Sequence, residues 1–257
     1  HHEDYNYGRN YSGNLPANLG LKFLGSNKDS FNTEDIEYVK DIYDEEISYT
    51  DKHIGELIDS INDLGLSNDT VIVLTADHGE EFMERNGFGH GKNLYQELIR
   101  IPLIIYAPGK LEHRGKRVKE NVETRSIPKT ILELSGIDSE FFGGENLLAL
   151  DQSNIDNYIY SEGSYARGLY NLREAIVLDQ LKLIRNIYNQ TFELYDLRSD
   201  PNEKINLFNT EQINIKNKQN ELMSKLSKHK KQRLGELQKV ELSKEDIKRL
   251  KALGYTQ

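Results

Sequence analysis

The feature that most constrains the fold is an unbroken apolar run from Thr70 to Thr75, TVIVLT. Its residues do not alternate between apolar and polar, and most are β-branched, which is typical of a strand buried on both faces. Before it, apolar residues recur at helical spacing from an N-cap candidate at Thr33 up to Gly65, a suitable C-cap. A helix that leads into such a strand predicts an α/β fold with a mostly parallel sheet flanked by helices.

A second unit of the same kind follows along the chain. Helical sequence over 93–98 leads into the apolar run from Ile101 to Tyr106, and a further helix is predicted from Ser126 to Leu134. We therefore expect residues 1–145 to form one α/β portion.

After this portion the pattern changes to shorter β-like runs. These runs cover 158–160, 174–178, 181–187 and 191–195. Turns at Asp179-Gln180 and Asn189-Gln190 between them predict a small antiparallel sheet, and helical, charge-rich sequence follows from about residue 210. We expect residues 146–257 to form a smaller α+β subdomain.

Composition excludes several classes of function. A formal net charge of −9 argues against a nucleic-acid-binding protein, which needs a basic surface. The absence of cysteine excludes disulfides, thiolate metal sites and a cysteine nucleophile within these residues. No run approaches the roughly 20 apolar residues that span a bilayer. The chain begins at His1 without methionine, so its compartment stays open, and the pair His1-His2 is either native or the end of a purification tag.

The sequence that carries chemistry follows the first apolar run directly, as Asp77-His78-Gly79. In open α/β sheets, ligands bind beyond the carboxyl ends of the strands, where Asp77 and His78 are expected. A carboxylate and an imidazole at a bend can share one metal ion, and Gly79 permits a bend. The structural alternative is an Asp-His pair that caps a following helix or turn. We favour metal binding because of the sequence that comes next.

The segment 75–105 resembles the sulfatase family of the alkaline phosphatase superfamily. Its members carry an Asp-His or Asp-Asn pair, then a glycine-rich loop with a lysine, then an Arg-Val/Ile-Pro-Leu strand. The segments 193–203 (ELYDLRSDPNE) and 251–255 (KALGY) are similar to later parts of the same family. Agreement at three separated places, in the same order, covers most of the chain.

The resemblance implies roles for individual residues. Asp77 and His78 match a pair of metal ligands, normally around calcium in sulfatases; because calcium prefers oxygen donors, the histidine leaves Mn²⁺ or Zn²⁺ open. Lys92 matches the lysine that contacts the sulfate and the leaving oxygen, where its ammonium would offset developing charge. His2 matches a histidine that reaches the substrate and protonates the leaving group, although Asp4 stands where the family has proline. His90 is a candidate substrate-binding residue, and an ordinary loop histidine is the alternative.

The family's nucleophile, a formylglycine made from Cys or Ser in a Cys/Ser-any-Pro-any-Arg motif, matches nothing in this chain. The resemblance therefore implies part of a sulfuric ester hydrolase that is inactive alone and needs a missing N-terminal half. Its expected partner is a sulfated small molecule or glycan, with no nucleic acid; the oligomeric state stays open. One alternative is a phosphodiesterase, phosphonate hydrolase or phosphotransferase of the superfamily. Another is a non-catalytic interaction module with the same fold.

Overall fold

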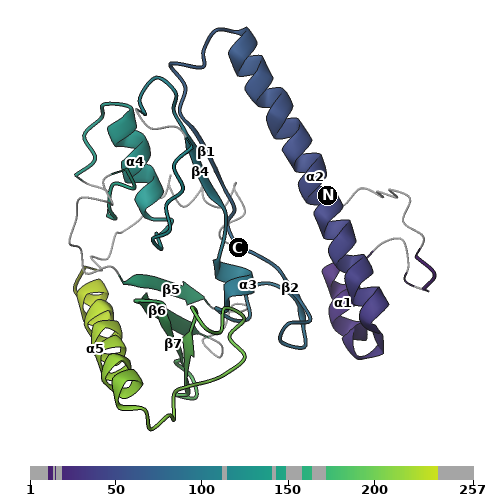
Figure 1. The fold of residues 1–257 in the computed structure, drawn as a ribbon, viewed down its shortest axis with the longest axis vertical. Coiled ribbons are helices and arrows are strands. Elements are labelled where there is room, and N and C mark those ends of the chain that lie inside the picture. Colours follow the sequence, from purple (N-terminus) through teal and green to yellow (C-terminus); the bar gives the residue numbers. More distant parts are fainter. Residues whose placement is uncertain are drawn as a thin grey trace, which may run out of the picture. The chain divides into compact units, whose positions relative to one another are not determined.

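The computed structural model (Figure 1) describes residues 11–13, 15, 19–111, 115–140, 143–148, 158–163 and 172–236, apart from the side chains of residues 21, 22 and 230–236. Its elements are, in order, α1 (Leu21–Asn27), η1 (Lys28–Ser30), α2 (Thr33–Asp63), β1 (Ile72–Thr75), β2 (Glu81–Phe82), β3 (Phe88–Gly89), α3 (Gln96–Ile99), β4 (Leu103–Tyr106), α4 (Ser126–Leu134), β5 (Ile159–Gly163), β6 (Arg173–Leu178), β7 (Leu181–Asn186), β8 (Phe192–Asp196) and α5 (Ile213–Glu236). The predicted helices over 33–64 and 126–134 are therefore confirmed.

The N-cap of the long helix α2 is Asn32, one residue before the predicted N-cap Thr33. The side chain of Asn32 accepts a hydrogen bond from the backbone N–H of Asp35, and the Asp35 carboxylate accepts one from the N–H of Asn32. This capping box satisfies donors that the first helical turn leaves unpaired. After the helix, Gly65 takes the left-handed conformation with a φ of +70°, as the sequence predicts.

The strands β1 and β4 lie side by side (Figure 1), but their arrangement corrects two expectations. They pair antiparallel, with Ile72 opposite Tyr106 and Thr75 opposite Leu103. Parallel neighbours need a crossover, usually through a full helix, whereas the helix between these strands is the single turn α3. Nor is β4 buried on both faces here, since Ile104 is 57% exposed, and the residues Ile72 to Leu74 of β1 are only half-buried. Among the described residues, these two strands have no further strand beside them.

A short hairpin follows β1 and holds the candidate site. The strands β2 and β3 pair antiparallel, with Glu81 opposite Gly89. Phe88 of β3 is buried with Leu24 of α1 and Val39 of α2, so this small core anchors the hairpin to both helices. The hairpin was not predicted, because strands of two residues carry no periodic pattern.

The strands β5 to β8 form the predicted antiparallel sheet in sequence order. The turn between β6 and β7 lies at Asp179 and Gln180, which both have positive φ, as the short β-hairpin requires. Leu183 and Leu194 are fully buried, so this sheet has a dense apolar core.

The chain divides into two compact units, residues 1–209 and 210–257. The sheet of β5 to β8 belongs to the first unit with the α/β portion, and α5 belongs to the second. The division predicted after residue 145 stays a prediction. None of the helices in the described part is long and apolar enough to cross a membrane.

Candidate active site

The end of β1 is held against α3 by an unusually close backbone approach. The N–H of Gly79 donates a hydrogen bond to the carbonyl of Leu98 at 2.8 Å. A β-carbon at position 79 would collide with the backbone carbonyl of Glu97. Gly79 is therefore required because the two backbone segments lie so close. Its φ is not positive, so the backbone conformation alone does not require glycine.

Asp77 and His78 emerge at this strand end with their ligand atoms turned together. Nε2 of His78 lies 3.5 Å from Oδ2 of Asp77. Nδ1 of His78 lies 2.8 Å from the carbonyl oxygen of Gly79, which only accepts, so Nδ1 carries the proton. Nε2 is therefore the ring nitrogen that is turned toward Asp77 and is placed to meet a metal ion. The Asp77 carboxylate is 88% exposed, and its Oδ1 accepts the N–H of His78 at 3.0 Å.

Two further side chains join His78. The ring of His90 stacks on that of His78 with centroids 3.9 Å apart, and Nδ1 of His90 lies 2.9 Å from Oε2 of Glu80. One ligand atom from each of His78, Glu80 and His90 falls within 4.8 Å of the others. Oε1 of Glu80 is buried without a hydrogen-bond partner in the described structure. This second carboxylate was missed by the sequence reasoning, although its place between the two histidines was a signal.

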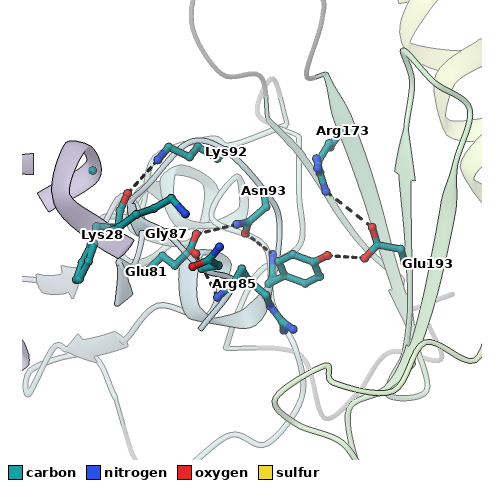
Figure 2. A pocket seen from close by; sticks show the side chains of 12 residues that line it. Lys28, Glu81, Arg85, Gly87, Lys92, Asn93, Arg173 and Glu193 are labelled. Atoms are coloured by element: carbon teal, nitrogen blue, oxygen red, sulfur yellow. Dashed lines mark hydrogen bonds and ion pairs between the residues drawn. The ribbon is translucent and has the colours of Figure 1, made fainter. Parts of the chain in front are cut away.

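Lys92 follows His90 but borders a different space. Its ammonium donates a hydrogen bond to the carbonyl of Phe88 at 3.1 Å. It lines a cavity of about 410 Å³ whose described lining residues include none of the candidate metal ligands. The structure thus places Asp77 and His90 each beside His78. Lys92 lines the separate cavity shown in Figure 2. His2 lies outside the described residues.

A buried ionic network ties α3 to the four-stranded sheet. Nζ of Lys182 lies 2.7 Å from Oε1 of Glu203, and both side chains are 0% exposed. The other carboxylate oxygen of Glu203 accepts the N–H of Gln96, the first residue of α3, at 2.6 Å. Desolvation by burial lowers the pKa of Lys182 and raises that of Glu203, and the attraction between the pair opposes both shifts. Since α3 also receives the Gly79 hydrogen bond, the sheet supports the turn that carries Asp77 and His78.

Arg85, in the hairpin loop, extends this network. Its Nε donates to Glu97 at 3.1 Å, and its terminal nitrogens donate to the backbone carbonyls of Asn202 and Glu203 at 2.7 and 2.8 Å. Its guanidinium also lies 4.0 Å from the centre of the Tyr95 ring. The contacts with Asn202 and Glu203 could not be predicted from local sequence, because these residues lie more than 100 positions from Arg85.

Two protein-family models match the chain. A model described as Sulfatase matches residues 11–137, and one described as "N-sulphoglucosamine sulphohydrolase, C-terminal" matches residues 85–232, more than half of the chain.

Individual proteins match in the same sense. An arylsulfatase of Clostridium perfringens is 29% identical over 191 residues, which are 72% of this chain and 39% of that protein. A solved structure in complex with its substrate, D-glucosamine-2-N,6-O-disulfate, has a TM-score of 0.60 and 23% identity over 74% of this chain and 40% of its own. A phosphonate monoester hydrolase of Agrobacterium radiobacter has a TM-score of 0.70 and 21% identity over 83% of this chain and 45% of its own. The chain spans 30–39% of the length of the first curated relatives that it matches. The structural matches confirm the predicted fold class.

Proposed function

Because this chain belongs to the sulfatase family, we propose that it forms part of the active site of a sulfuric ester hydrolase that acts on a sulfate monoester. The observation that carries the proposal is the pair of ligand atoms at the end of β1, Asp77 Oδ2 and His78 Nε2, which lie 3.5 Å apart while Nδ1 of His78 contacts the Gly79 carbonyl oxygen. The nucleophile and the remaining metal ligands would come from residues outside this chain.

The described side chains fit a divalent metal ion. Asp77 and His78 would hold it, and the unpaired buried oxygen of Glu80 supports a cation nearby. The family resemblance favours Ca²⁺, whereas the nitrogen donors of His78 and His90 suit Mn²⁺ or Zn²⁺ better. When bound, the ion would neutralise charge on the sulfate oxygens.

The other candidate residues would handle the substrate. Lys92 would offset negative charge on the ester oxygen as its bond breaks, because a lysine ammonium is a compact charge that suits an anionic group. His2 would donate the proton that the leaving alcohol needs. Glu80 holds His90 through Nδ1, so Nε2 is the nitrogen that would contact and orient the substrate.

The substrate that we propose is a sulfated small molecule or glycan. The resemblance to an arylsulfatase and to a protein crystallised with a disulfated glucosamine supports this class. A phosphonate or phosphate ester is the alternative, because a phosphonate monoester hydrolase shares the fold. A non-catalytic module would not need Asp77, His78 and Lys92 together.

The experiment is an assay of the full-length protein against 4-nitrophenyl sulfate and 4-nitrophenyl phenylphosphonate. We expect turnover of the sulfate to exceed that of the phosphonate, to stop after metal chelation, and to return with one of Ca²⁺, Mn²⁺ or Zn²⁺. Lys92→Ala should lower kcat at least about 100-fold, as the loss of one charge-stabilising donor does elsewhere. Lys110→Ala is the matched control, an exposed lysine outside the cavity. A faster phosphonate reaction would select the alternative, and absence of both reactions would contradict the proposal.

A further inference from the structure

The cavity that Lys92 borders extends away from the candidate metal ligands, toward the four-stranded sheet. Its described lining residues come from α1 and η1, the β2–β3 hairpin and its following loop, and strands β6 and β8. We propose that this cavity is a subsite for a second sulfate group of the substrate, and that Lys28 and Arg173 bind that group. The inference rests on the proposed function, since it assigns a second anion to the same substrate.

The charges of the cavity wall favour an anion. The wall carries four cationic side chains, Lys28, Arg85, Lys92 and Arg173, against two carboxylates, Glu81 and Glu193. Among the lining side chains alone positive charges exceed negative ones by two; Arg85 and Lys28 also have carboxylate partners outside the lining, Glu97 and Asp29. Figure 2 shows Lys28 and Lys92 on one side of the cavity and Arg173 with Glu193 on the other. At about 410 Å³ the cavity has the size of a small-molecule site.

Both carboxylates of the wall are already engaged. Glu193 accepts hydrogen bonds from the hydroxyls of Tyr95 and Tyr195 at 2.5 and 2.8 Å. Glu81 accepts from the side-chain amide of Asn93 at 3.1 Å and from the backbone N–H of Arg85 at 3.2 Å. These bonds reduce how far the carboxylates oppose a bound anion.

Arg173 is the residue that most needs a partner. Its Nε is buried and, within the described structure, donates no hydrogen bond. Its ion pair with Glu193 is long, 3.9 Å between Nη1 and Oε1. A buried donor without an acceptor is costly, so such a group requires an explanation. A guanidinium has several donors that match the oxygens of a sulfate, and the Arg173 side chain, which lines the cavity, is 22% exposed, so an anion can reach its outer part.

Lys28 supplies the opposite wall. Its ammonium lies 3.0 Å from the carboxylate of Asp29, which is 83% exposed and therefore a weak competitor for a charge in the cavity. The subsite differs from the position of the sulfate that is cleaved, because Asp77 and His78 do not line this cavity. Lys92 lies where the two positions would meet.

The test counts bound sulfate ions in the metal-loaded full-length protein. Isothermal titration with inorganic sulfate at constant ionic strength should find two sites in the wild type, and a crystal soaked in sulfate should place one ion at Arg173. Arg173→Gln should leave one site or weaken the second at least about tenfold, and Lys28→Gln should weaken it severalfold. Arg173→Lys, which keeps the charge, should retain most of the binding. Arg117→Gln, an exposed arginine outside the cavity, should change nothing.

The outcomes separate this inference from the proposed function. One sulfate site in the wild type, no site, or a second site that survives Arg173→Gln would overturn the subsite. A folded Arg173→Gln protein is verified by an unchanged circular dichroism spectrum and by the remaining sulfate site. Because binding is measured without turnover, a protein that fails to hydrolyse sulfate esters but loses one of its two sulfate sites in Arg173→Gln would refute the proposed function and keep the anion subsite.

Discussion

Two of the sheets in the described part of the chain, β1 with β4 and β5 to β8, are built from similar apolar residues and yet differ in their role. β1 and β4 form a pair with Ile104 and Tyr106 exposed, and their end carries the candidate metal ligands. The sheet of β5 to β8 has a core of fully buried leucines, and its Lys182 forms a buried pair with Glu203 of the loop after β8. The comparison indicates that the first sheet positions the candidate metal ligands, whereas the second stabilises the fold. Variants in the first should therefore change activity, and variants in the second should change stability.

The largest expected effect tests the first half of this comparison. Asp77→Ala or His78→Ala should lower the activity of the full-length protein at least about 1,000-fold, because a metal ion contributes several kcal/mol of charge stabilisation. Stability in the metal-free state should change little, since the Asp77 side chain is almost fully exposed. Turnover of 4-nitrophenyl sulfate measures the activity, elemental analysis the bound metal and urea unfolding the stability, with Asp69→Ala, another exposed aspartate, as the control. Unchanged metal content would remove both residues from the ligand set.

A variant of the four-stranded sheet tests the second half of the comparison, the contribution of that sheet to stability. Lys182→Met should reduce the free energy of unfolding by about 3–5 kcal/mol, because it leaves Glu203 buried without its counter-charge. The double variant Lys182→Met/Glu203→Gln should recover part of that loss, since no lone charge remains. Denaturant unfolding provides the measurement. A loss below about 1 kcal/mol in the single variant would show that the pair is not a structural requirement of the sheet.

Gly79→Ala tests the contact between the turn after β1 and α3, the helix that the loop after β8 supports through Glu203. The added β-carbon meets the Glu97 carbonyl, so the strand end must move, at a cost of about 1–3 kcal/mol. Metal affinity should fall together with stability, because Asp77 and His78 precede this contact directly. Gly55→Ala, on α2 with open space around it, is the control and should stabilise slightly. If Gly79→Ala kept full metal affinity, support from α3 would not matter for the ligands.

The smallest expected effect concerns Tyr95, whose hydroxyl links α3 to Glu193 of β8. Burial, then the hydrogen bond with Glu193, raises the pKa of Tyr95 to about 12. Because the folded pKa lies above the usual value near 10, this group's contribution to stability is present below pH 10 and is lost as pH rises toward 12. Tyr95→Phe should cost about 1 kcal/mol at neutral pH and weaken the fall in stability between pH 10 and 12. The free energy of unfolding of both proteins is measured from pH 7 to 12. If the variant and the wild type lost stability equally between pH 10 and 12, Tyr95 would not contribute to that loss.

Much of this architecture follows from local sequence. Helical spacing predicts α2 and α4, and short apolar runs between turn residues predict the sheet of β5 to β8. The direction in which β1 and β4 pair could not be predicted, because it depends on the conformation of the 27 residues between Thr75 and Leu103. The apolar runs likewise predict the strands β1 and β4, but they do not predict which other elements cover the two faces of these strands.

The candidate site divides in the same way. Asp77, His78 and His90 could be predicted because they lie close in sequence and next to a strand end. Glu203 and Arg173 could not, because their roles depend on contacts between distant segments. The sequence predicts that Gly79 permits a bend, but the close contact with the carbonyl of Glu97 could not be predicted, because it depends on a segment 18 residues away.

The hydrogen bond between Glu203 and the N–H of Gln96 has a consequence for the order of assembly during synthesis. Its partners are 107 residues apart, and those of the Arg85 contact to Glu203 are 118 apart. At typical translation rates of about 5–20 residues per second, roughly 5–20 s separate the synthesis of α3 from that of its support. During that interval α3, which contacts the turn that carries Asp77 and His78, lacks the hydrogen bond from Gln96 to Glu203. Metal capture by the growing chain should therefore be weak until the loop that contains Glu203 has left the ribosome.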